Sequence, residues 1–286
     1  MLDSLSLDDW GGTGPVLHFA HANGFPPGSY RQLIERLTPH FHVYSWRGSC
    51  FVPGSEPRSL RRWEELADEM AQLLLDRGFE RMIGLGHSMG GVATLFASLK
   101  YPRLFRSVVA LDPVLMTGAR TWVLRAASVL GVRHRLPPAS LALRRREVWP
   151  TRELASLSYR KKLLFSRFDP ACFQDYLDHG LTERPEGGFR LTIPREWEAR
   201  CFETAPSSPW AQLRGVTVPT FVLRGGDSDT LTRSALSRVA RTVPHVHTEE
   251  LDGTTHLFPL EQPEACAQRI LAFLASVEDP SSRRAA

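Results

Sequence analysis

The chain has 286 residues, of which 42% are hydrophobic and 23% charged, and its net charge is only +4. These are ordinary values for a globular protein with one large core or a core plus an insertion. No apolar run approaches the roughly 18 residues of a membrane span, and the acidic N-terminus lacks the basic and apolar regions of a signal peptide. The sequence therefore predicts neither a membrane span nor secretion.

The cysteines and the charge distribution narrow the class further. Cys50, Cys172, Cys201 and Cys266 are widely spaced, which favours free thiols in a reducing cytoplasm over a disulfide framework or a zinc site. Residues 115–207 hold 16 Lys and Arg against 10 Asp and Glu. The basic residues lack the dense, aromatic-interleaved stripe of a nucleic-acid site, so we interpret them mainly as solvated helix faces. A mild preference for anionic substrates is the alternative.

Strand-like and helix-like segments alternate along most of the chain. Short runs rich in β-branched or aromatic residues predict strands at Val16–Ala20, Phe41–Trp46, Arg81–Leu85, Ser107–Leu111, Pro219–Leu223 and Val246–Leu251. Helical periodicity predicts helices at Tyr30–Leu37, Trp63–Asp76, Val92–Leu99, Leu231–Thr242 and Glu264–Val277. This order indicates an α/β protein with a doubly wound, mostly parallel sheet covered on both faces.

The alternation breaks between residues 115 and 207. Helices are predicted there at Arg120–Leu130, Leu141–Glu147, Glu153–Phe165 and Pro170–Gly180, with one turn at residues 186–188 leading into a short extended piece. We interpret residues 115–207 as a mainly helical cap or lid inserted into a core made of residues 1–114 and 208–278. The tail, residues 279–286, is predicted to be disordered.

The most informative motif is Gly86-His87-Ser88-Met89-Gly90, a G-x-S-x-G sequence between an apolar strand and a helix. A serine on so sharp a turn needs small neighbours, and the turn presents its hydroxyl at a helix N-terminus. A glycine-rich turn without catalytic function is the alternative. The strand-turn-helix context favours Ser88 as a nucleophile.

A nucleophilic serine needs a histidine base and a carboxylate that orients it, in the chain order serine, acid, histidine. His256 lies in a Gly/Thr loop after the last strand, which is where catalytic groups gather in parallel sheets. For the acid we favour Asp229, which follows a strand and the turn Gly225-Gly226. Asp227 in the same loop and Asp112 after the preceding strand are the alternatives, each with an ordinary interpretation as a turn or cap residue.

The loop after the first strand reads His21-Ala22-Asn23-Gly24-Phe25-Pro26. Gly24 lets the backbone approach a substrate, and Asn23 is expected to brace the loop. Because Pro26 has no N–H, the backbone N–H of Phe25 is the expected oxyanion donor, together with that of Met89 after the nucleophile.

With these elements in order, the chain resembles the α/β-hydrolase superfamily over nearly its whole length. Asn23–Pro26 is similar to the family's His-Gly-Phe-Pro motif, with Asn in place of His, and Gly86–Gly90 resembles the nucleophile elbow. The resemblance implies an eight-stranded sheet, but residues 1–15 leave room for only an abbreviated N-terminal hairpin. Some enzymes of this family take their acid from the strand before the cap, where Asp112 lies.

The resemblance implies a serine hydrolase that needs no metal or organic cofactor. We expect a small-molecule substrate, a carboxylic ester of a small to medium acyl group, and no nucleic-acid partner. Hydrolysis of a carbon–carbon bond, lactone or thioester is the alternative within the fold, and ligand binding or signalling with a retained triad is the alternative from another class. Aromatic residues of the insertion are candidates for the substrate pocket or for the insertion's own core, among them Trp149, Phe173, Tyr176 and Trp197. The sequence does not indicate an oligomeric state.

Overall fold

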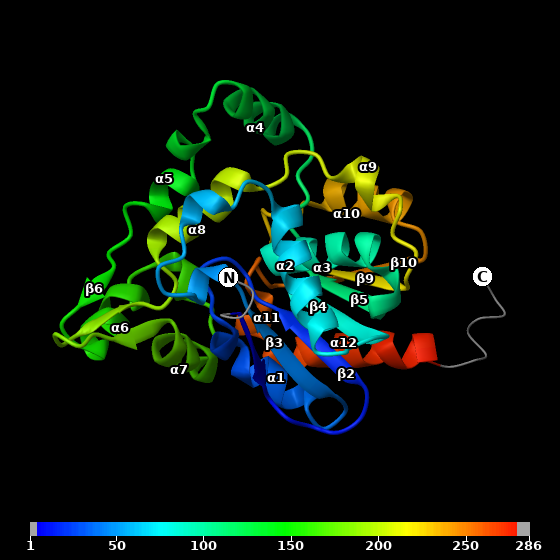
Figure 1. Ribbon diagram of the computed structural model, residues 1–286, viewed down its shortest axis with the longest axis horizontal. Helices are drawn as coiled ribbons and strands as arrows, with labels where there is room; N and C mark the ends of the chain where they lie inside the picture. Colours follow the sequence, from blue (N-terminus) through cyan, green and yellow to red (C-terminus); the bar gives the residue numbers. More distant parts are fainter. Residues whose placement is uncertain (1–4, 279–286) are drawn as a thin grey trace.

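The computed structural model describes residues 5–278, so the tail predicted at residues 279–286 lies outside the described part. Its centre is a seven-stranded sheet in the order β1-β3-β2-β4-β5-β9-β10 (Figure 1). Only the edge strand β1 is antiparallel to its neighbour. The strands are β1 Ser6–Asp9, β2 Val16–Ala20, β3 His42–Arg47, β4 Met82–His87, β5 Phe105–Leu111, β9 Thr220–Gly225 and β10 Val246–Leu251. The predicted doubly wound, mostly parallel sheet is thus confirmed, with one N-terminal strand where the family pattern has a hairpin.

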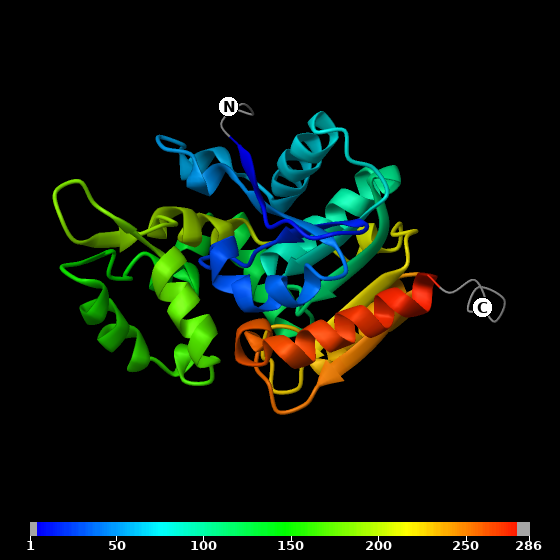
Figure 2. The same ribbon diagram turned by 90° about the horizontal axis from the view of Figure 1, so that it is seen from below.

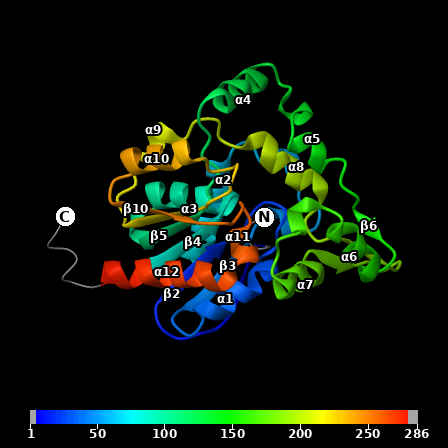
Figure 3. The same cartoon turned by 180° about the vertical axis from the view of Figure 1, so that it is seen from behind.

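Helices cover both faces of this sheet. On one face lie α2, α3, α9 and α10, and on the other lie α1, α11 and α12, which Figures 1 and 3 show above and below the strands. Their bounds are α1 Arg31–Leu37, α2 Trp63–Asp76, α3 Met89–Lys100, α9 Trp210–Leu213, α10 Arg233–Thr242, α11 Phe258–Glu261 and α12 Pro263–Glu278. None of the helices in residues 5–278 combines the length and apolar character needed to cross a bilayer.

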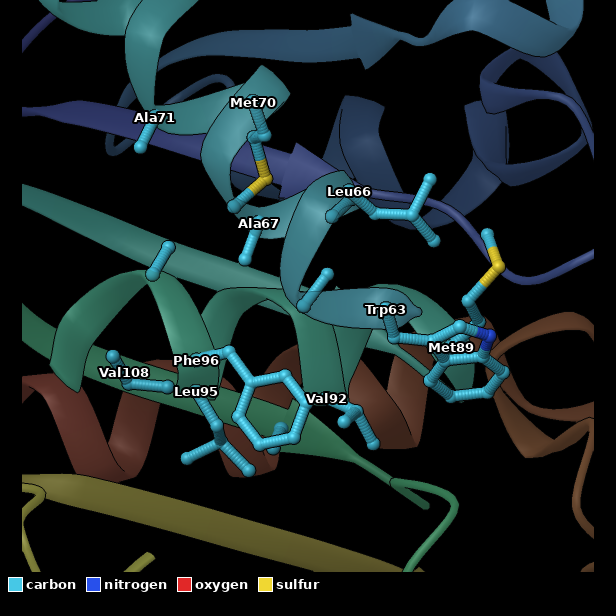
Figure 4. Packing of buried hydrophobic residues seen from close by; sticks show 14 of the residues in the cluster. Trp63, Leu66, Ala67, Met70, Ala71, Met89, Val92, Leu95, Phe96 and Val108 are labelled. Atoms are coloured by element: carbon cyan, nitrogen blue, oxygen red, sulfur yellow. The ribbon is translucent and has the colours of Figure 1, made fainter. Parts of the chain in front are cut away.

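The two cores follow from the two-residue period of the strands. In β5, Val108 and Ala110 face the α2–α3 side, whereas Val109 and Leu111 face the α1–α12 side. Strand β5 therefore carries apolar residues on both faces, as expected for a central strand of a sheet buried between helices. Figure 4 shows α2 packing through Trp63, Leu66 and Met70 onto α3. These are the positions that the 3.6-residue period predicts for the buried face of α2.

Residues 115–207 lie to one side of the core, on the left in Figure 2. This insertion contains α4 Ala119–Val129, α5 Ala139–Ala142, α6 Arg152–Arg160, α7 Pro170–His179 and α8 Arg195–Thr204. It also holds a three-stranded sheet in the order β6-β8-β7, made of Val148–Trp149, Phe189–Leu191 and Leu181–Glu183. The predicted helix at Leu141–Glu147 is wrong, because the chain turns after the four-residue α5 and enters β6.

Short 3-10 turns connect many of these elements. They are η2 Pro27–Tyr30, η3 Ser49–Phe51, η4 Pro57–Ser59, η5 Pro102–Leu104, η6 Arg133–Arg135 and η7 Leu163–Phe165. Of these, η2 matters for the site, because it directly follows the loop at residues 21–26 and leads into α1.

Candidate active site

Ser88 lies on a strained turn between β4 and α3. Its backbone has φ +57° and ψ −115°, a conformation that residues other than glycine rarely adopt. The turn is so tight that a Cβ on Gly86 would lie 2.4 Å from the Gly90 carbonyl oxygen, and one on Gly90 would lie 2.2 Å from that of Ala20. Both glycines are therefore required by packing. The Ser88 N–H donates to the Leu111 carbonyl at 2.9 Å, which ties the turn to β5.

The histidine predicted from the sequence lies against this serine. His256 Nε2 is 2.9 Å from Ser88 Oγ, a distance at which the hydroxyl donates to the ring. His256 comes from the loop between β10 and α11. Glu261 of α11 holds this loop, because its carboxylate accepts hydrogen bonds from both the N–H and the hydroxyl of Thr255. The structure thus brings Ser88 and His256 together.

The carboxylate that meets His256 is Asp112, not Asp229. His256 Nδ1 lies 2.8 Å from Asp112 Oδ2, and the Asp112 side chain has no solvent exposure. Three further donors bind this carboxylate: the Ser228 hydroxyl and the backbone N–H groups of Gly225 and Leu231. Four hydrogen-bond partners hold this carboxylate in a fixed orientation beside the imidazole.

Strand order explains why Asp112, and not the predicted Asp229, lies beside His256. In the parallel pair β4–β5, His87 is aligned with Leu111, so the next residues, Ser88 and Asp112, emerge side by side. The Asp229 side chain is exposed, and its carboxylate contacts only the neighbouring Thr230 hydroxyl among the hydrogen bonds within residues 5–278. Asp227 is exposed as well and pairs with Arg167 of the insertion at 3.2 Å. The loop after β9 therefore contributes donors to Asp112 rather than the acid itself.

The two predicted oxyanion donors differ in the structure. Met89 is the first residue of α3, so its N–H has no partner within the helix. The Phe25 N–H instead donates to the Ala22 carbonyl at 3.1 Å and closes a turn. Asn23 braces this turn as predicted, because its side-chain amide donates to the Glu198 carbonyl at 2.9 Å. Gly24 has φ +79°, the left-handed conformation that favours glycine.

An ion pair that the sequence analysis did not single out lies beside the same turn. Arg145 pairs with Glu198, and both side chains are largely buried. A Cβ on Gly24 would lie 3.2 Å from Glu198 Cδ and 3.4 Å from Arg145 Nη1. Arg145 Nη2 also donates to the Tyr176 hydroxyl at 2.8 Å. No periodicity marks these residues, because they come from three segments of the insertion.

The four aromatic residues predicted for the pocket have different surroundings. Tyr176 packs on Phe25, with 5.3 Å between ring centroids, and so lies against the oxyanion loop. Trp149 and Phe173 are buried in the aromatic core of the insertion, next to Tyr159 and Phe165 respectively. Trp197 is also buried, and its indole N–H donates to Ser55 at 3.1 Å. Of the four, Tyr176 is the one whose ring packs on a ring of the predicted oxyanion loop.

Residues 5–278 contain no cluster of three or more His, Cys, Asp or Glu side chains suited to a metal ion. The site within them is Ser88 and the buried Asp112 at the carboxyl ends of the adjacent strands β4 and β5, together with His256 from the loop after β10. Comparison with known proteins agrees with this arrangement, since a model of the alpha/beta hydrolase family matches residues 19–269. The chain belongs to the α/β-hydrolase family. It is a hydrolase of the α/β-hydrolase fold.

Proteins that are similar in sequence carry different names. The chain is 25% identical to 2-(acetamidomethylene)succinate hydrolase of Mesorhizobium japonicum, over 92% of this chain and 89% of the relative. It is 29% identical to the Abhydrolase domain-containing protein ACTT2 of Alternaria alternata, over 66% of this chain and 81% of that protein.

Solved structures show the same likeness at the level of the fold. The structure of E-2-(acetamidomethylene)succinate hydrolase superposes with a TM-score of 0.75 at 21% identity, covering 95% of each chain. A thermophilic esterase from Thermogutta terrifontis superposes with a TM-score of 0.68 at 22% identity, covering 96% of this chain and 94% of the esterase.

Proposed function

We propose that the protein hydrolyses carboxylic esters of small to medium acyl groups through an acyl-enzyme on Ser88. The observation that carries the proposal is the continuous hydrogen-bond chain from Ser88 through His256 to Asp112. A serine hydroxyl is a poor nucleophile at neutral pH, and a histidine oriented by a carboxylate is the arrangement that activates it. The acid in the proposal is Asp112, in place of the Asp229 that the sequence predicted.

Each residue has a defined role in the proposed reaction. His256 Nε2 takes the Ser88 proton as Oγ attacks the carbonyl carbon, and the C–O bond to the leaving alcohol breaks as His256 returns that proton to it. A water molecule, deprotonated by His256, then attacks the acyl carbon. The bond between this carbon and Ser88 Oγ breaks as His256 returns the proton to Oγ, which releases the acid and regenerates Ser88. Asp112 keeps His256 Nδ1 protonated and stabilises the imidazolium.

The negative oxygen of each tetrahedral intermediate needs backbone donors. The Met89 N–H at the start of α3 supplies one, assisted by the positive end of the helix dipole. The turn at residues 22–25 supplies the second in the proposal, and the Phe25 N–H would exchange the Ala22 carbonyl for the substrate oxygen. Each such donor is worth about 3–4 kcal/mol of transition-state stabilisation.

The insertion, residues 115–207, is the cap in this proposal, with the domain bounds that the sequence predicted. Supporting contacts come from Tyr176, which packs on Phe25, and from Arg167, which binds the loops after β9 and β10. The cap thus touches the oxyanion turn and the histidine loop, where it would set acyl-chain length.

The test is hydrolysis of p-nitrophenyl esters from acetyl to dodecanoyl by the wild type and Ser88→Ala. We expect an optimum at short to medium chains and a loss of about 10⁵–10⁶-fold in kcat for Ser88→Ala. Ser98→Ala is the matched control, because this buried serine of α3 donates only to Leu95 of its own helix. A fluorophosphonate should label the wild type and Ser98→Ala once, and Ser88→Ala not at all.

Other results of these experiments would contradict parts of the proposal. Ester turnover that survives in Ser88→Ala would contradict the nucleophile. Labelling of Ser88 without turnover of any ester would favour ligand sensing. If the protein showed no labelling and no turnover, the serine-hydrolase proposal would be overturned.

A second candidate, hydrolysis of an ester or amide that carries a carboxylate, is favoured by Arg145. This arginine lies at the oxyanion turn, beside Gly24 and Tyr176, and a guanidinium is suited to bidentate binding of a carboxylate. The name of the relative from Mesorhizobium japonicum also describes a substrate with carboxylates. Glu198 accepts from Nη1, and the hydroxyls of Tyr176 and Tyr159 accept from Nη2, so a substrate carboxylate would have to displace one of these partners to bind Arg145 in bidentate fashion.

Paired substrates distinguish this candidate from simple ester hydrolysis. The p-nitrophenyl monoester of glutaric acid should have a lower KM than p-nitrophenyl butyrate, and Arg145→Gln should raise only the KM of the acid. Arg144→Gln is the control, because Arg144 is the exposed neighbour of Arg145. Equal effects of Arg145→Gln on both substrates would exclude carboxylate recognition by this residue.

A further inference from the structure

His87, the second residue of the Gly86–Gly90 motif, is a buried polar side chain that the proposed reaction does not use. It is the last residue of β4 and has no solvent exposure. Its ring lies on the α1–α12 face of the sheet. The ring centroid of Tyr30 is 5.7 Å away and that of His256 is 5.0 Å away. Most buried polar side-chain atoms in proteins have a hydrogen-bond partner, so the partners of both His87 nitrogens are informative.

Both nitrogens have partners, and these come from the two other loops of the site. His87 Nδ1 is 2.7 Å from the Tyr30 hydroxyl, and Nε2 is 2.9 Å from the backbone carbonyl of His256. Tyr30 is the fully buried last residue of η2 and follows the oxyanion turn. Its hydroxyl also receives the Ala22 N–H at 3.4 Å.

The chemistry of these partners fixes the direction of every hydrogen bond. A carbonyl oxygen only accepts, so the proton of His87 is on Nε2. The Nδ1 lone pair then accepts from the Tyr30 hydroxyl, whose oxygen in turn accepts from Ala22. Burial, and next the adjacent His256, hold the pKa of His87 well below its ordinary value, so the ring stays neutral and the pattern is unique.

We infer that Tyr30 and His87 are positioning residues for the proposed reaction. They hold three segments in register: the oxyanion turn (residues 22–25), the nucleophile turn (residues 86–90) and the histidine loop (residues 252–257). One series of hydrogen bonds, Ala22–Tyr30–His87–His256, connects the three segments. A second series, Ser88–His256–Asp112, connects the reacting side chains. Fixing the His256 carbonyl limits rotation of the loop that carries the ring. A displacement of a catalytic group by about 1 Å can lower the reaction rate up to a hundredfold. We therefore expect these hydrogen bonds to affect kcat rather than substrate binding.

The inference rests on the proposed function for its kinetic test. Tyr30→Phe removes only the hydroxyl, and His87→Leu removes the donor to His256. We expect each to lower kcat by about tenfold to a hundredfold with KM within about twofold of the wild type. His87→Gln, whose amide N–H can reach the carbonyl in place of Nε2, should recover part of the loss. Ser98→Ala again controls for the loss of a buried hydroxyl.

A spectroscopic readout separates this inference from the hydrolase proposal. In the wild type, nitrogen NMR should find His87 neutral and protonated on Nε2 between pH 6 and 8, whatever the activity. The downfield proton of His256 Nδ1 should shift or broaden in Tyr30→Phe and His87→Leu and stay unchanged in Ser98→Ala. An Nδ1-protonated or cationic His87, or an unchanged His256 signal in both variants, would overturn the inference. If the wild type lacks ester turnover, the proposed function fails while this measurement still decides the inference.

Discussion

Asp112 and Asp229 carry the same functional group in opposite surroundings. Asp112 is buried with four donors, whereas Asp229 is exposed and has no contact with His256. Asp112→Asn places an amide beside Nδ1 and favours the wrong imidazole tautomer, so we expect kcat to fall by about 10⁴-fold. Asp229→Asn should leave kcat within about twofold, and steady-state kinetics on the best p-nitrophenyl ester provide the comparison.

The pair of variants also tests the alternative acids. If Asp229→Asn or Asp227→Asn lost activity to the same extent as Asp112→Asn, the geometry at His256 would not describe the working enzyme. Retained activity in Asp112→Asn would have the same meaning. Circular dichroism of each variant excludes unfolding as the cause, which matters for Asp112 because its carboxylate also binds the loop after β9.

At the scale of elements, Arg167 is the side chain that connects the insertion to the histidine loop. It binds Asp227 at 3.2 Å, the carbonyl of Gly253, and Glu261 at 3.8 Å. Glu261 is almost fully buried and holds Thr255 beside His256. Arg167→Gln removes the cation next to this carboxylate, so we expect a loss of about 1–2 kcal/mol in the free energy of unfolding.

The same substitution should lower kcat several-fold, because the loop that carries His256 loses its contact with the insertion. Arg167→Lys should restore part of the stability. Arg144→Gln, on an exposed side chain of the same insertion, should change neither quantity. Urea unfolding followed by tryptophan fluorescence measures the first effect and ester kinetics the second. A fully stable and fully active Arg167→Gln would show that this contact does not matter.

The core elements were predictable because long periodic segments determine them. The period of α2 places its buried residues correctly, and β2 and β10 have the predicted bounds. The insertion was less predictable because β6, β7 and β8 have only two or three residues each, too few to show a period. Ser88 and His256 meet as expected, since motif and loop position specify them. The acid depends on which strand end lies beside Ser88, which is a property of sheet order that one-dimensional spacing does not contain.

At the scale of the whole molecule, the sheet buries three histidines in their neutral form. Burial lowers the pKa of His18 to about 3 and that of His21 to about 4, and it holds that of His87 well below its ordinary value. Neither ring nitrogen of His18 has a hydrogen-bond partner within the described residues. In the unfolded chain each histidine takes up a proton near pH 6.5. The folded state therefore binds fewer protons than the unfolded state between about pH 4 and 6.5.

The sign of the pH dependence follows from this difference. Stability from neutral burial is fully present above about pH 7 and is lost as the pH falls below 6.5. The loss is about 2 kcal/mol for each of His18 and His21 between pH 7 and pH 5, and His87 acts in the same direction. Burial raises the pKa of Glu69, which acts in the opposite direction, but it is one group against three. We expect a net loss of about 4 kcal/mol in the free energy of unfolding over this range.

His18→Leu separates this mechanism from general acid effects. The leucine removes from the centre of β2 a group that takes up a proton on unfolding and that has no hydrogen-bond partner in the fold. The variant should therefore lose about 2 kcal/mol less stability than the wild type between pH 7 and pH 5. At pH 7 it should be at least as stable as the wild type, because the imidazole has no hydrogen bond to lose. Urea unfolding at pH 7, 6 and 5, followed by tryptophan fluorescence, gives both slopes. A wild-type change below about 1 kcal/mol, or equal slopes for the two proteins, would show that protonation of these buried histidines does not limit stability in acid.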